Sequence, residues 1–81
     1  MVKIYGSMLC KDCVQCRKDL DAAGVAYEYT DFAHSLAALK EFLAIRDTNP
    51  LFDDVKKAGG IGIPCILRED GSITLSWEAY M

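Results

Sequence analysis

The sequence lacks three features that would indicate particular classes of protein: an excess of positive charge, a long apolar run and an export signal. Nine Lys and Arg residues stand against twelve Asp and Glu residues, a formal net charge of −3, whereas nucleic acids and anionic membranes bind basic surfaces. No apolar run approaches the roughly 18 residues that cross a bilayer. Residues 1–5 enter strand-like alternation at once, unlike a signal peptide. We therefore expect a cytoplasmic protein with no nucleic-acid and no membrane partner.

The length of 81 residues predicts a single domain, residues 1–81, because a second core needs on the order of 50 residues of its own. The chain is 52% hydrophobic and 26% charged, which is typical of globular domains and not of disordered segments. It contains no repeat and no low-complexity segment. One folded unit is expected.

The first third of the chain predicts a strand, a helix and a second strand. Residues 2–6 alternate with period two. A helical stripe follows, and Gly24 stands where a glycine typically ends a helix. Residues 25–30 then form a strand, so the pair of strands is expected to be parallel with a right-handed crossover. The stripe consists of Cys13, Cys16, Leu20 and Ala23.

The remainder predicts a second helix and a hairpin. Ser35 is a good N-cap for a helix that must end near Asn49, since the residue before Pro50 avoids helical geometry. Residues 51–58 are expected to form a further short helical turn, residues 63–67 a strand led by Pro64, residues 69–72 a turn and residues 73–76 the returning strand. The fold class is α/β, with a four-stranded mixed sheet and flanking helices.

Four cysteines are the unusual feature of the composition. Cys10, Cys13 and Cys16 are three residues apart and form two overlapping C-x-x-C motifs, which in a cytosolic chain indicate redox or metal chemistry. Cys10 lies where a strand passes into a helix, and the unpaired N–H groups there stabilise a thiolate. Cys16 lies about 9 Å farther along the axis and gains almost nothing. Cys10 is thus the predicted nucleophile, and Cys13 the thiol that resolves the mixed disulfide.

Two other interpretations of the cysteines stay open. Cys16 lies on the apolar stripe and Cys65 in a strand, so both are also explained as small buried residues. Alternatively Cys10, Cys13, Cys16 and Cys65 ligate zinc or an iron–sulfur cluster, because C-x-x-C-x-x-C is also a cluster-binding spacing. On the redox interpretation the protein needs no metal.

The order of elements around Cys10-x-x-Cys13 resembles the glutaredoxin branch of the thioredoxin superfamily. The resemblance covers nearly the whole chain, and its landmarks are residues 4–6 ahead of Cys10, the run of residues 20–28, and residues 62–64. It implies a thioredoxin-like fold of glutaredoxin type and a thiol–disulfide oxidoreductase active in electron transport and cell redox homeostasis. It also implies a cis Pro64 that faces the reactive sulfur. Pro64 and the Ile63 backbone would hold a protein or small disulfide substrate. The charge of Lys11 leaves two interpretations open: it steers an acidic substrate, or it is simply solvated.

The chain departs from that family at the sites of glutathione recognition and at its end. Ser7 replaces a basic residue three before the nucleophile, and residues 75–78 replace a Gly-Gly-x-Asp-like stretch, which weighs against glutathione as co-substrate. The reducing partner is expected to be glutathione or a thioredoxin-reductase type protein. The closing C-terminal helix of the family is missing or truncated. The sheet face it leaves bare is expected to be covered by Trp77 and Tyr80 or by a second copy in a homodimer.

Overall fold

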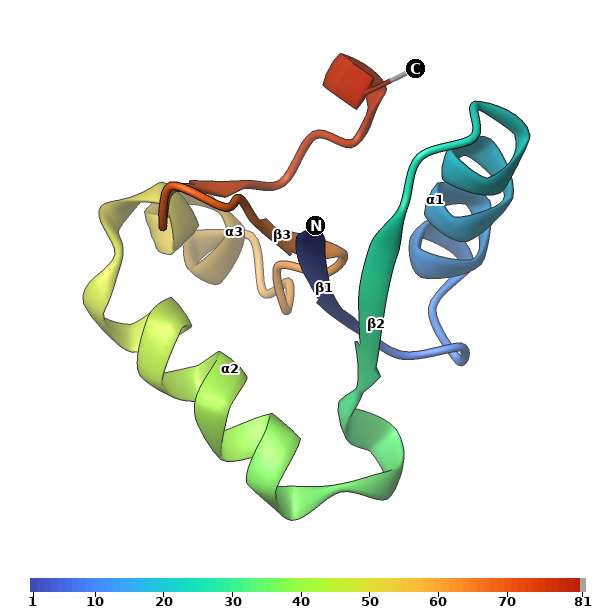
Figure 1. Ribbon diagram of the computed structural model, residues 1–81. Coiled ribbons are helices and arrows are strands. Elements are labelled where there is room, and N and C mark those ends of the chain that lie inside the picture. Colours follow the sequence, from blue (N-terminus) through green and yellow to red (C-terminus); the bar gives the residue numbers. More distant parts are fainter. Residues whose placement is uncertain (81) are drawn as a thin grey trace.

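The computed structural model describes residues 1–80 and shows a compact α/β fold with a four-stranded mixed open sheet (Figure 1). The strands are β1 (Val2–Gly6), β2 (Tyr27–Asp31), β3 (Cys65–Leu67) and β4 (Ile73–Thr74), in the order β2-β1-β3-β4. Strand β1 pairs with β2 in parallel and with β3 in antiparallel fashion, and β3 pairs antiparallel with β4. These pairings confirm the predicted mixed sheet.

Three α-helices and three short 3₁₀ turns complete the described chain. The helices are α1 (Lys11–Ala22), α2 (Leu36–Thr48) and α3 (Asp53–Lys57). The turns are η1 (Phe32–His34), η2 (Pro50–Phe52) and η3 (Glu78–Tyr80). No helix among residues 1–80 is both long and apolar enough to cross a membrane.

Helix α1 ends as its sequence predicts. Gly24 has φ of +72°, its N–H bonds to the Asp21 carbonyl, and the N–H of Val25 bonds to the Leu20 carbonyl. These two hydrogen bonds form the Schellman motif, which satisfies backbone carbonyls at the end of the helix. Because Val25 belongs to the helix cap, the strand predicted for residues 25–30 begins only at Tyr27.

Helix α2 also follows its sequence signals. The Ser35 hydroxyl accepts a hydrogen bond from the Ala38 N–H at 3.2 Å and caps the helix. The helix stops at Thr48, and Asn49 is extended ahead of Pro50, as expected from the restriction on residues that precede proline. The short helical turn predicted for residues 51–58 is present as η2 and α3.

Two predicted strands are shorter than expected. Residues 63 and 64 precede β3 and do not pair with a neighbouring strand. The returning strand ends at Thr74 and not at Ser76, because the Thr74 hydroxyl accepts the Ser76 N–H at 3.1 Å and turns the backbone away from β3. The β3–β4 hairpin is therefore short, and β4 forms a two-residue strand at the edge of the sheet.

The central strand β1 is covered on both faces. Ile4 packs in one apolar cluster with residues of α1, while Tyr5 packs in a second cluster with Phe42 of α2 and Phe52 of η2. Figure 1 shows α1 and α2 on different sides of the sheet. The α1-side cluster contains Val2, Ile4, Cys16, Leu20 and Ile66.

The C-terminal segment returns to the α1 side after β4 (Figure 1). Trp77 packs against the α1-side cluster, and its indole N–H donates to the Asp19 carboxylate at 2.8 Å. The predicted role of Trp77 as a cover for this face is thereby confirmed. The side chain of Tyr80, for which the same role was expected, lies outside the described residues.

Replacing Trp77 with Ala should lower the free energy of unfolding by about 2–3 kcal/mol, because a large, partly buried aromatic leaves the core surface. The measurement is urea unfolding followed by circular dichroism. Trp77→Phe is the matched control, and it should lose only about 1 kcal/mol with the hydrogen bond to Asp19. Equal stability of Trp77→Ala and the wild type would contradict this role for Trp77.

Candidate functional site

Cys10 is the N-cap of α1, at the end of the loop that follows β1. Its backbone is extended, with φ of −98° and ψ of 126°, and its carbonyl accepts the first helical hydrogen bond from Val14 at 3.1 Å. Its side chain makes no capping bond to the helix. The first N–H groups of α1 therefore have no partner from the Cys10 side chain.

The other three thiols are completely buried, while Cys10 is partly exposed. All four cysteines are free. Cys13 lies one turn into α1, close enough to Cys10 for their side chains to interact. Burial raises the pKa of the Cys13 thiol to about 12, of Cys16 to about 11 and of Cys65 to about 12. At neutral pH these three thiols are protonated and shielded from solvent.

Cys13 can lie directly against the end of β1 because Gly6 has no side chain there. A Cβ atom on Gly6 would lie 2.8 Å from the Cys13 Sγ and 2.9 Å from the Tyr29 hydroxyl oxygen. Contacts of that length do not occur without movement, so only glycine permits this approach of helix and strand. A hydrogen bond from the Ser7 backbone opposes the effect of burial and lowers the pKa of Cys13.

An apolar hollow of about 370 Å³ opens beside Cys10, and we call it the Cys10 hollow. Leu9 and Ile61 at its edge are 89% and 55% exposed. None of its lining side chains is charged. The lining residues are Ser7, Leu9, Cys10, Phe32, Ala33, Ile61 and Ile63.

The structure brings some of the predicted site residues together and separates others. Cys10, Cys13 and Ile63 converge at the Cys10 hollow or beneath it. The Ile63–Pro64 peptide bond is cis, as the family resemblance implied, and Pro64 is buried next to Ile63. Lys11 is exposed on the first turn of α1 and does not line the hollow.

The four thiols do not form a common ligand set. Cys16 is buried in the α1-side cluster and Cys65 in the α2-side cluster, on opposite faces of the sheet. Among residues 1–80, no three His, Cys, Asp or Glu side chains are gathered so that they could hold a metal ion. The interpretation of Cys16 and Cys65 as buried packing residues is confirmed by their zero exposure.

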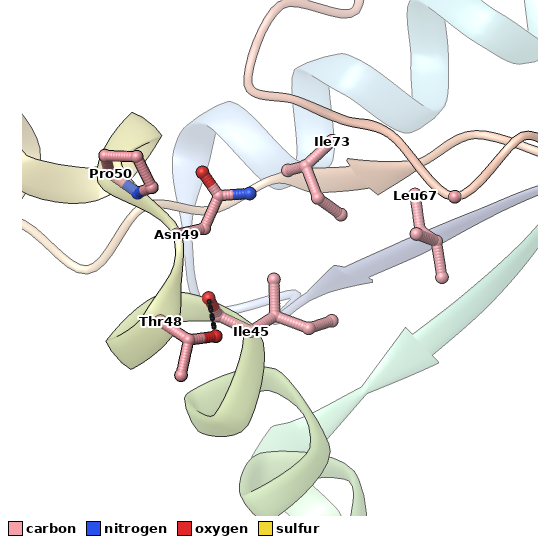
Figure 2. A pocket seen from close by; sticks show the side chains of 7 residues that line it. Ile45, Thr48, Asn49, Pro50, Leu67 and Ile73 are labelled. Carbon is pink, nitrogen blue, oxygen red and sulfur yellow. Dashed lines mark hydrogen bonds between the residues drawn. The ribbon is translucent and has the colours of Figure 1, made fainter.

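A second hollow, of about 340 Å³, lies between the end of α2 and the β3–β4 hairpin (Figure 2). Its polar side chains are used locally: the Thr48 hydroxyl donates to the Ala44 carbonyl at 2.8 Å, and the Asn49 side chain accepts the Leu51 N–H at 2.9 Å. Figure 2 shows Ile45, Leu67 and Ile73 along the rest of it. No thiol, carboxylate or imidazole lines this hollow.

Several residues of the site were not found from the sequence. Tyr29 has no part in the site predicted from the sequence, and Gly6 enters it only within the landmark run of residues 4–6, yet both lie at Cys13. The signal that could have found Tyr29 is its alternation with Tyr27, which places both rings on the α1 side of the sheet. Phe32, Ala33 and Ile61 carried no such signal, because turns and loops bring them to Cys10.

These observations define a compact α/β protein in which a partly exposed thiol, Cys10, lies next to a buried one, Cys13. The chain is 36% identical over 72 residues to an uncharacterized protein of Haemophilus influenzae, and the match covers 89% of this chain and 84% of that protein. The chain therefore belongs to the same family as that protein. No family model matches the chain, and no solved structure matches it significantly.

Gly6→Ala should lower the free energy of unfolding by about 1–3 kcal/mol, since the added methyl group overlaps the Cys13 sulfur. Gly6 does not have a positive φ, so the loss of stability comes from steric overlap and not from backbone strain. The control is the same substitution in a Cys13→Ala background, where chemical denaturation should give a cost smaller by about 0.5 kcal/mol or more. An equal cost in the two backgrounds would refute the contact.

Cys65 should make stability fall with rising pH above about 9. Burial raises its pKa from an ordinary 9.0 to about 12, so the folded chain keeps a proton that the unfolded chain releases. Stability from this group is complete below pH 9 and declines by about 1.4 kcal/mol per pH unit up to about pH 12. Denaturant titrations at several pH values should show a shallower decline for Cys65→Ala and Cys65→Val. Curves parallel to the wild type would disprove this assignment.

Proposed function

We propose that the protein is a small thiol–disulfide oxidoreductase with a thioredoxin-like fold of glutaredoxin type. The observation that carries the proposal is the pairing of a partly exposed Cys10 at the start of α1 with a buried Cys13 one turn later. Thiol–disulfide exchange needs one accessible sulfur for attack and a second within reach for resolution. The order of strands and helices around this pair also supports the proposed glutaredoxin type of fold.

The reaction transfers two electrons from the dithiol to a substrate disulfide. The Cys10 thiolate attacks one sulfur of the substrate, the substrate S–S bond breaks, and the released thiolate takes a proton from water. Cys13 then loses its proton and attacks the Cys10 Sγ, which forms the Cys10–Cys13 disulfide and releases the second substrate thiol. A reducing partner, glutathione or a thioredoxin-reductase type protein, returns the disulfide to the dithiol.

The Cys10 hollow favours a polypeptide disulfide as substrate. Its exposed edge is formed by Leu9 and Ile61, which can bury apolar residues that flank a disulfide. Glutathione carries two carboxylates, and no cationic side chain lines the hollow to pair with them. Lys11 remains outside it, in a position to steer an acidic partner toward Cys10.

Cys10→Ser should reduce insulin disulfides no faster than the dithiothreitol that drives the assay. Cys13→Ser should instead accumulate a covalent mixed disulfide with the substrate, visible by mass spectrometry, because the first attack proceeds and resolution does not. Cys16→Ala, which removes a buried thiol from the same helix, is the matched control and should retain activity.

Full activity of Cys10→Ser would end the proposal. A dominant Cys13–Cys16 bond in peptide maps of the oxidised protein would overturn the assignment of roles. Elemental analysis and a visible spectrum of anaerobically purified protein test the metal alternative, since stoichiometric zinc or iron on the thiols would replace redox exchange with metal binding.

A further inference from the structure

The hydroxyl group of Tyr29 is a buried polar group without a well-formed hydrogen bond among residues 1–80. Such groups are rare and usually have a reason. Tyr27, two residues earlier on β2, provides the contrast: its hydroxyl donates to Asp21 at 2.7 Å and accepts from Arg17 at 3.4 Å. The missing partner at Tyr29 is therefore particular to that position.

The Tyr29 hydroxyl lies at the buried sulfur of Cys13. Both atoms surround the space where a Gly6 Cβ would stand, 2.9 Å and 2.8 Å from it. Burial raises the pKa of Cys13, and the side-chain interaction with Tyr29 acts in the opposite direction. Burial, together with the neighbouring Cys13 and Asp31, raises the pKa of Tyr29, so that its phenol keeps the proton it can donate.

We propose that Tyr29 is a catalytic residue of the resolving step, and that its hydroxyl donates a hydrogen bond to the Cys13 thiolate as this sulfur attacks Cys10. The inference rests on the proposed function. A neutral thiol is a weak acceptor, which fits the poor hydrogen bonding of Tyr29 in the dithiol form. Once Cys13 releases its proton to solvent, the buried sulfur carries a charge that needs donors, and Tyr29 and the Ser7 backbone N–H supply them.

Arg17 holds the ring of Tyr29 in this position. Its guanidinium carbon lies 4.6 Å from the ring centroid, a cation–π distance. The charged and titratable groups around the pair are thus Cys10 at the N-cap of α1, Arg17 on α1 and Asp31 at the end of β2. In the resolving step the Cys10 sulfur is bonded to the substrate and carries no proton. Tyr29→Phe leaves all of these groups in place.

The test is stopped-flow reaction of the reduced protein with dithionitrobenzoate, which releases one thionitrobenzoate when Cys10 attacks and a second when Cys13 resolves the mixed disulfide. Tyr29→Phe keeps the ring and its stacking with Arg17. We expect an unchanged first phase and a second phase slower by about 10-fold, with its pH dependence shifted upward by about one pH unit. Tyr27→Phe is the matched control and should leave the second phase unchanged.

Three results would overturn the proposal. An unaltered second phase and pH profile in Tyr29→Phe would show that the hydroxyl does not serve the thiolate. Equal slowing in Tyr29→Phe and Tyr27→Phe would indicate a loss of packing on β2, which unfolding curves would reveal independently. Absence of a Cys10-dependent first phase in the wild type would remove the proposed function itself and this inference with it.

Discussion

The close approach of α1 to the end of β1 at Gly6 is the constraint on which the thiol pair depends. Because position 6 has no side chain, the Cys13 sulfur can lie directly against the sheet. The loop of residues 7–9 then fixes how far Cys10 stands from the strand: the Ser7 carbonyl accepts the Cys10 N–H at 3.1 Å, and the Ser7 hydroxyl accepts the Leu9 N–H at 3.1 Å. Gly6 at the end of β1 and the hydrogen-bonded loop of residues 7–9 together place the Cys13 sulfur inside the protein and leave Cys10 partly exposed.

The three-residue spacing gives the two sulfurs opposite environments on the same helical turn. Cys10 retains access to solvent at the start of the helix, whereas Cys13 is desolvated and its pKa rises to about 12. A thiol of that kind is a poor nucleophile toward solutes, since exchange proceeds through the thiolate. The Cys13 thiol can react only with a sulfur that already lies beside it, such as that of Cys10. Under the proposed function, this asymmetry would assign attack on the substrate to Cys10 and resolution to Cys13.

Local signals in the sequence predicted what depends on local backbone chemistry. Gly24, Ser35 and Pro50 fix the ends of the helices through φ angles, capping bonds and steric restriction, and each acts as expected. Where strands end depends on competing hydrogen bonds, such as the one within Thr74–Ser76 that shortens β4. Cys10, Cys13 and Ile63 were identified because a motif marks them. Tyr29 was not, because the distance from its hydroxyl to the Cys13 sulfur is set by packing and by the missing Cβ of Gly6. Its alternation with Tyr27 indicates only the face of the sheet on which it lies.

The two thiols outside the Cys10–Cys13 pair lie in the apolar core. Cys16 follows Cys13 at the same spacing that joins Cys13 to Cys10, yet it faces Leu20 and Ile4 in the α1-side cluster. Nearby Asp19 and Glu78 raise its pKa further beyond the effect of burial. Both influences disfavour its thiolate, and Cys65 is enclosed on the other face of the sheet. Of the two overlapping C-x-x-C motifs, only the first begins outside the helix, at a partly exposed cysteine.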